Sequence, residues 1–174
     1  MKVDVSRYTQ VERILHNLAF SSWFPQVPLS KIETYIFNNQ LDAVSVEKPV
    51  FITALPRAGT TLLLELCVST TEFASHRYRD MPFLLTPLLW DQFSRHFRTS
   101  GALTERVHGD GILVNADSPD AFEEIIWKEF WPSYYKKDKI LLWTKSNYPA
   151  FEEFFRSHMQ KMILLHGNAD KSTR

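Results

Sequence analysis

The sequence has little of three features that would each point to a class of protein. Cys67 is its only cysteine, which rules out an internal disulfide and leaves no cysteine cluster for zinc. Its 20 lysines and arginines balance 20 aspartates and glutamates, which argues against nucleic acid or an anionic membrane as the main partner. No apolar run approaches the roughly 20 residues of a transmembrane helix, and the N-terminus lacks a signal-peptide pattern. We therefore expect a cytoplasmic protein that needs no metal.

What the chain does contain is one strand, loop and helix pattern in residues 50–71. Val50, Phe51 and Ile52 predict a short buried strand, because they form an apolar run rich in β-branched side chains. Residues 62–67 predict a helix that is apolar on nearly all sides and therefore buried. The loop between them, residues 56–61, reads PRAGTT.

The loop has the composition of an anion site. Pro56 stiffens the backbone, and Gly59 would let it approach a ligand closely. Arg57 supplies a charged planar fork, while Thr60 and Thr61 add hydroxyl donors. The start of the following helix would aim unpaired backbone amides at the same point. This arrangement favours a bound phosphate or sulfate over an ordinary turn between a strand and a helix.

The loop departs from the nucleoside triphosphatase motif, in which a lysine follows the second glycine. Ala54 stands where the first glycine of that motif would be, and Thr60 occupies the lysine position. A nucleotide phosphotransferase is therefore the less favoured alternative.

The PRAGTT loop resembles the 5'-phosphosulfate loop of sulfotransferases, above all the carbohydrate, protein-tyrosine and bacterial members. A second patch, SPDAFEEIIW at residues 118–127, is also similar to bacterial members. The resemblance implies an α/β fold of the P-loop type, with a three-layer parallel sheet and helices on both faces. It implies transfer of a sulfuryl group from 3'-phosphoadenosine 5'-phosphosulfate (PAPS) to a hydroxyl acceptor. The PAPS-binding residues would be Pro56, Arg57, Ala58, Gly59, Thr60 and Thr61, with Ala58 in place of the customary serine.

Candidate reacting groups follow the central helix. A second parallel strand near Phe73 would deliver His76 and Asp80 beside the anion. The resemblance implies a general base a little over twenty residues past the loop arginine, where Asp80 lies. An equally good interpretation is that Asp80 caps the helix opened by Pro82. We take Arg57, His76 and Asp80 as the catalytic candidates.

The remaining pattern predicts a single domain, with a helical cap over residues 1–47 and a P-loop core over 48–174. Within the cap, helices are expected at residues 11–18 and after Ser30, the second with an apolar face of Ile32, Tyr35, Ile36 and Leu41. Within the core, a hairpin or an exposed loop is expected around residues 109–111, and a short strand at 140–143. A helix should begin with Ser118 as its N-cap, and a long amphipathic helix should begin at Pro149.

The prediction is of an incomplete domain. The strand at residues 50–52 and two or three short further candidates make a poor sheet for so many helices, and the sequence stops before the segment that the resemblance implies for the 3'-phosphate of PAPS. The second reading is therefore a non-catalytic or partner-completed fragment, associating with itself or with a completing chain.

Overall fold

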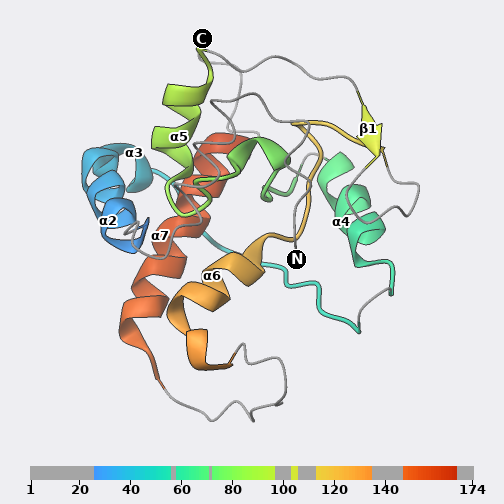
Figure 1. The fold of residues 1–174 in the computed structure, drawn as a ribbon. Coiled ribbons are helices and arrows are strands. Elements are labelled where there is room, and N and C mark those ends of the chain that lie inside the picture. Colours follow the sequence, from blue (N-terminus) through green and yellow to red (C-terminus); the bar gives the residue numbers. More distant parts are fainter. Residues whose placement is uncertain are drawn as a thin grey trace.

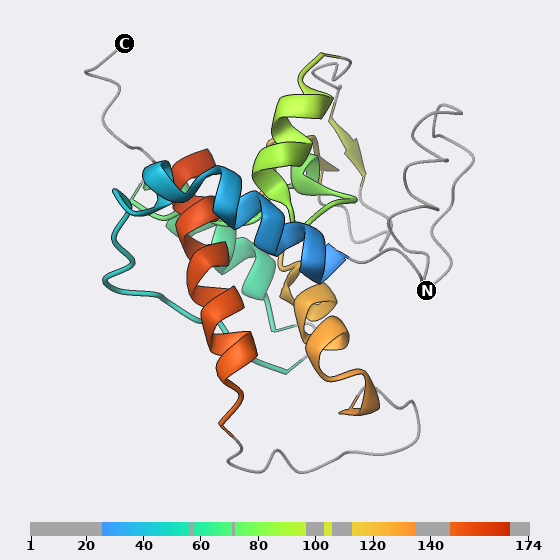
Figure 2. The ribbon, with the colours of Figure 1, turned by 90° about the vertical axis from the view of Figure 1, so that its left-hand side faces the viewer.

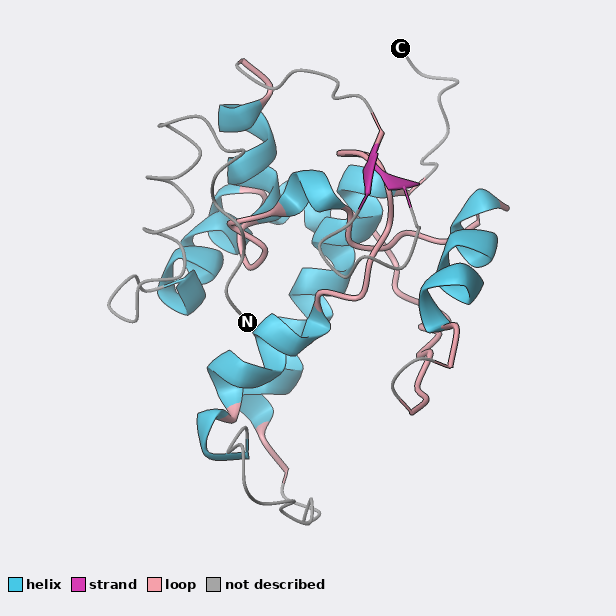
Figure 3. Ribbon diagram, turned by 45° about the vertical axis from the view of Figure 1, so that its right-hand side comes forward, coloured by secondary structure: helices cyan, strands magenta, loops and turns pink. Residues whose placement is uncertain are grey.

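The computed structural model describes residues 26–55, 58–70, 72–96, 103–105, 113–134 and 147–167. The helix expected at 11–18 and the strand expected at 140–143 lie outside these residues. The described chain is rich in helix and has almost no strand (Figure 3). In order, its elements are α2 (Gln26–Ile36), α3 (Asn38–Leu41), α4 (Thr60–Ser69), η2 (Tyr78–Asp80), α5 (Pro87–Ser94), β1 (Thr104–Glu105), β2 (Leu113–Val114), α6 (Glu123–Phe130), η3 (Pro132–Tyr134) and α7 (Pro149–His166).

Helix α7 is the element around which the others gather (Figure 1). It begins at Pro149, as the sequence predicts, because proline is well suited to the first turn of a helix. It packs against α3 and α5. One core cluster joins Phe154 of α7 to Ile126 of α6 and to Leu84 and Leu85, which precede α5. The long helix therefore ties together α3, α5, α6 and the segment before α5.

Helices α2 and α3 cross α7 on one side of the molecule (Figure 2). The sequence predicts that these helices bury an apolar face, and most of the residues predicted for that face are in fact exposed. Ile32, Tyr35 and Ile36 are 54%, 85% and 57% exposed, and of the predicted set only Leu41 is buried. Helix α2 instead buries Glu33 and its neighbours on the opposite face, because that carboxylate has a cationic partner on α7.

The described residues contain no parallel sheet. Their single ladder is the antiparallel pair β1 and β2, with Thr104 opposite Val114 and Glu105 opposite Leu113. It agrees with the predicted hairpin, whose turn lies outside the described residues. The strand predicted at residues 50–52 is not formed, and Val50 and Phe51 are 61% and 63% exposed. Within the described chain no strand lies beside this extended segment to pair with its backbone or cover its side chains.

Helix α4 forms where the sequence predicts it, but the expected burial is wrong. No residue of α4 is buried, and Leu62, Leu63 and Leu66 are 67%, 48% and 63% exposed. The helix stands apart from the helices grouped around α7 (Figures 1 and 3). An all-apolar helix needs a covering layer on each side, and the described residues do not supply the sheet that would provide it.

The helix predicted to start at Ser118 begins later, at Glu123. Residues 115–120 are held instead against residues 76–79, which include the start of η2. Tyr78 N–H donates to the carbonyl of Ser118, and Asp120 N–H donates to the carbonyl of His76. The Ser118 hydroxyl accepts from the Asn115 amide and caps no helix. None of the described helices is both long and apolar enough to cross a membrane.

Candidate functional site

The described part of the predicted anion loop has a backbone conformation that allows α4 to begin directly after it. Gly59 occupies the N-cap position of α4 with φ 82° and ψ 20°, a left-handed conformation that favours glycine. The turn before it is closed by a bond from Ala58 N–H to the carbonyl of Leu55. The first helical bond runs from Leu63 N–H to the Gly59 carbonyl, so the amide of Thr60 lies ahead of it. Pro56 and Arg57, two of the loop candidates, lie outside the described residues.

The space around Gly59 is open. A Cβ atom built on this glycine would meet no atom within 4 Å among the described residues. The space beside Gly59 is therefore unobstructed, and none of the described residues closes around it there. Of the predicted PAPS-binding residues that the structure describes, Ala58, Gly59, Thr60 and Thr61, Thr60 lines a cavity.

A cavity of about 450 Å³ extends from this helix start toward α7. Thr60, His76 and His158 all line this cavity. Glu123 of α6 adds a carboxylate, and the rest of the wall is mainly apolar. The cavity thus brings Thr60 of the loop and His76, both predicted from the sequence, to the border of one space.

His76 is 5% exposed, and its imidazole contacts that of His158, with 3.4 Å between the two Nε2 atoms. Burial lowers the pKa of His76, while the nearby carboxylates of Glu123 and Asp80 oppose this shift. His76 is therefore an imidazole held neutral near pH 7, which is the state that a general base requires.

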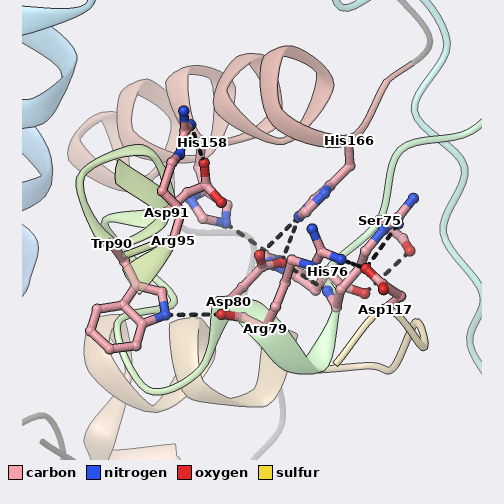
Figure 4. Close-up of polar contacts among 11 residues, drawn as sticks. Ser75, His76, Arg79, Asp80, Trp90, Asp91, Arg95, Asp117, His158 and His166 are labelled. Atoms are coloured by element: carbon pink, nitrogen blue, oxygen red, sulfur yellow. Dashed lines mark hydrogen bonds and ion pairs between the residues drawn. The ribbon is translucent and has the colours of Figure 1, made fainter. Parts of the chain in front are cut away.

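Asp80, the other candidate base, does not line the cavity. It is 2% exposed, and both of its carboxylate oxygens lie 2.9 Å from Nε2 of His166 (Figure 4). Its Oδ2 also accepts a 2.8 Å hydrogen bond from the Arg77 amide, so it caps the short η2 turn. The helix opened by Pro82, which it was expected to cap as the alternative, does not form, since α5 begins at Pro87. Asp80 is thus engaged in local structure, and His76 is the better placed of the two.

The sequence interpretation missed three buried polar residues on α7. His158, Lys161 and His166 are each paired with a residue from another segment, namely His76, Glu33 and Asp80. Figure 4 shows His158 and His166 reaching from the same helix toward these partners. A signal was present, because His158 and Lys161 follow Phe154 at spacings of four and seven residues and so share its inward face.

A cluster of charged side chains lies beside the site. Arg77 and Arg79 both pair with Asp117, and the Tyr78 hydroxyl donates a 2.7 Å hydrogen bond to Asp120. These contacts fix residues 77–80 against the segment before α6. The backbone that carries His76 is therefore anchored on its C-terminal side.

Known proteins offer no guide to this arrangement. A scan against family models, a search of curated proteins and a search of solved structures each found no match. The function must be argued from the site itself.

Proposed function

We propose that the chain is a sulfotransferase-type protein that transfers a sulfuryl group from PAPS to a hydroxyl acceptor. The observation that carries the proposal is that Thr60, next to the left-handed Gly59, and the buried His76 border the same cavity. The proposal includes a P-loop-type α/β fold, in which the extended residues 50–52 would become a strand of a parallel sheet. It also places the protein in the cytoplasm.

The chemistry divides between the loop residues and His76. PAPS would supply the activated sulfuryl group. Arg57 and the amides from Gly59 to Thr61 would hold its phosphosulfate end and stabilise the negative charge that gathers there. His76 would accept the proton of the acceptor hydroxyl, whose oxygen would bond to sulfur as the bond from sulfur to the 5'-phosphate oxygen breaks and 3',5'-diphosphoadenosine leaves.

Thermal unfolding with 3',5'-diphosphoadenosine tests the anion site. A ligand at about 100 times its Kd stabilises a protein by about 2.7 kcal/mol, which corresponds to a Tm rise of about 5–10 °C for a chain of this size. Arg57→Ala should abolish the rise. Arg156→Ala, which removes an exposed cation on α7, is the matched control and should keep it.

Two outcomes count against the proposal. An unchanged Tm of the parent protein at millimolar diphosphoadenosine would contradict the nucleotide site. A rise produced only by ATP with magnesium would favour the phosphotransferase alternative.

The second candidate is a P-loop fragment that is completed by association. The exposed row of Leu62, Leu63 and Leu66 on α4 favours it, since such a row is usually covered in a folded assembly. The exposed Val50 and Phe51 belong to the segment that leads toward the same helix.

The partner tested here is a second copy of this chain. Light scattering after size-exclusion chromatography measures the mass of the protein in solution. We expect the parent chain to have a mass above that of a monomer and Leu62→Gln with Leu66→Gln to be monomeric. The control is Ile32→Gln with Ile36→Gln, which removes two equally exposed apolar side chains from α2. A monomeric parent chain, or equal loss of association in both double variants, would contradict self-association through α4.

A further inference from the structure

The cavity that Thr60 borders is lined mainly by apolar side chains from three helices and an extended segment. Helix α7 contributes four residues at helical spacing, Phe155, Met159, Met162 and Ile163. Helix α4 adds Leu64 and Cys67, and the extended residues 46–53 also line the space. Such a wall favours a ligand with an apolar surface, because burying that surface removes it from water.

The size of the cavity is that of a small-molecule site. Its volume of about 450 Å³ falls within the roughly 300–1,000 Å³ that is usual for ligand cavities. The flexible thioethers of Met159 and Met162 can adjust to the outline of a ligand. A sugar would lose hydrogen bonds to water at each hydroxyl that the apolar wall leaves unpaired. The wall therefore favours a compact ligand with an apolar body.

Glu123 is a charged exception in this wall. It lies at the start of α6, it is partly buried, and its negative charge acts on His76. Among the described residues no cation pairs with Glu123, whereas the adjacent Glu124 pairs with Lys128. The positive end of the α6 dipole favours a carboxylate at this position but supplies no counter-ion. Glu123 is thus available to a cation that enters the cavity.

An aromatic surface lies beside this carboxylate. Trp127 follows Glu123 by four residues, so the two are neighbours on one face of α6, and both line the cavity. Phe155 of α7 lies next to Trp127, with 5.9 Å between the ring centroids. The faces of aromatic rings attract cations. Of the described wall residues, Lys48 alone carries a fixed positive charge, and it is exposed. The wall around Glu123 therefore suits a positive group.

We propose that this cavity binds a small molecule whose apolar body carries a protonated amine, with the amine beside Glu123 and Trp127. The apolar body would lie against the face of α7 that contains Met159. That this molecule is also the hydroxyl acceptor, an apolar amino alcohol, rests on the proposed function. Binding of the amine does not depend on it.

Isothermal titration calorimetry with three probes of similar shape tests the proposal without PAPS. The probes are 2-naphthylmethylamine, which is cationic at pH 7.5, 2-naphthylmethanol, which is neutral, and 2-naphthoate, which is anionic. The amine should bind about 10-fold more tightly than the alcohol, near the lower end of the effect of a hydrogen bond to a charged group. The carboxylate should bind more weakly than the alcohol, because Glu123 repels it.

Two variants separate the charge from the apolar wall. Glu123→Gln keeps the size of the side chain and should lower the affinity for the amine to that for the alcohol. Met159→Gln should weaken both probes by a similar factor, since it places an amide in the apolar wall. Glu129→Gln is the matched control and should change no affinity, because Glu129 is an exposed residue of the same helix that does not line the cavity. Circular dichroism and Tm establish that the variants fold.

Three outcomes would overturn the proposal. They are no binding of any probe at millimolar concentration, an alcohol that binds as tightly as the amine, and an amine preference that survives Glu123→Gln. The failures of the two proposals are distinguishable. A Tm rise with 3',5'-diphosphoadenosine but no preference for the amine would contradict this inference alone. The expected amine binding without that Tm rise would contradict the sulfotransferase proposal alone.

Discussion

Replacing Lys161 with methionine is expected to lower the free energy of unfolding by about 3–5 kcal/mol, the usual effect of leaving one buried charge without its partner. Lys161 and Glu33 are both completely buried, and Nζ lies 2.9 Å from Oε2. Nζ also donates two 2.9 Å hydrogen bonds to Ser30, one to its carbonyl and one to its hydroxyl. Methionine would fill most of the volume and satisfy none of these oxygens.

Burial disfavours the charged form of both Glu33 and Lys161. Burial raises the pKa of Glu33 and lowers the pKa of Lys161, while their mutual attraction opposes both shifts. Glu33 also accepts a 2.7 Å hydrogen bond from the Leu89 amide, so it links α2 to α5 as well as to α7. Loss of the lysine should therefore loosen three helices at once.

Urea unfolding measures the effect, and a surface pair provides the control. Lys128 pairs with Glu124 at 2.6 Å on α6 with both side chains about half exposed, so Lys128→Met should cost less than about 1 kcal/mol. Glu33→Gln combined with Lys161→Met should recover part of the loss, because the amide still accepts from Leu89 and no charge remains buried. Equal costs for Lys161→Met and Lys128→Met would contradict a structural role for the buried pair.

The sequence predicts local structure well wherever neighbouring residues decide it. Pro149 and the apolar spacing after it predict α7, and Gly59 marks the start of α4. These features depend on backbone preferences and on the period of one helix. They need no information about what lies on the far side of the element.

The sequence predicts the buried face of an element poorly wherever that face is determined by a partner from a distant segment. The inward face of α2 contains Glu33 because Lys161 lies opposite it, 128 positions later in the chain. The apolar rule applied to one helix selects Ile32 and Tyr35 instead, and both are exposed. Ser118 was likewise expected to cap a helix, yet its backbone pairs with Tyr78.

The candidate site divides in the same way. Gly59 and Thr60 could be found from the sequence because their chemistry lies within one loop. His76 was proposed from its expected position after a strand that does not form in the described chain, and it still reaches the cavity. His158 could not be placed at the site, because only its contact with His76, 82 residues away in the sequence, brings it there.

Acidification is expected to destabilise the protein through the same pair of histidines. Because burial lowers the pKa of His76 and His158, the folded chain binds fewer protons at these sites than the unfolded chain near pH 6. Stability contributed in this way is complete above the ordinary histidine pKa of about 6.5 and is lost as pH falls below it. The loss approaches about 1.4 kcal/mol per pH unit for each histidine that gains its proton only on unfolding.

Urea unfolding between pH 7.5 and pH 5 measures the slope, and variants assign it. His76→Gln with His158→Gln should flatten the slope, whereas His96→Gln, which removes an exposed histidine after α5, should leave it unchanged. The raised pKa of Glu33 acts against the histidine slope, because the folded chain binds a proton at Glu33 more readily than the unfolded chain does. A slope that persists in the double histidine variant would show that the acid sensitivity lies elsewhere and that the pair is not held neutral by burial.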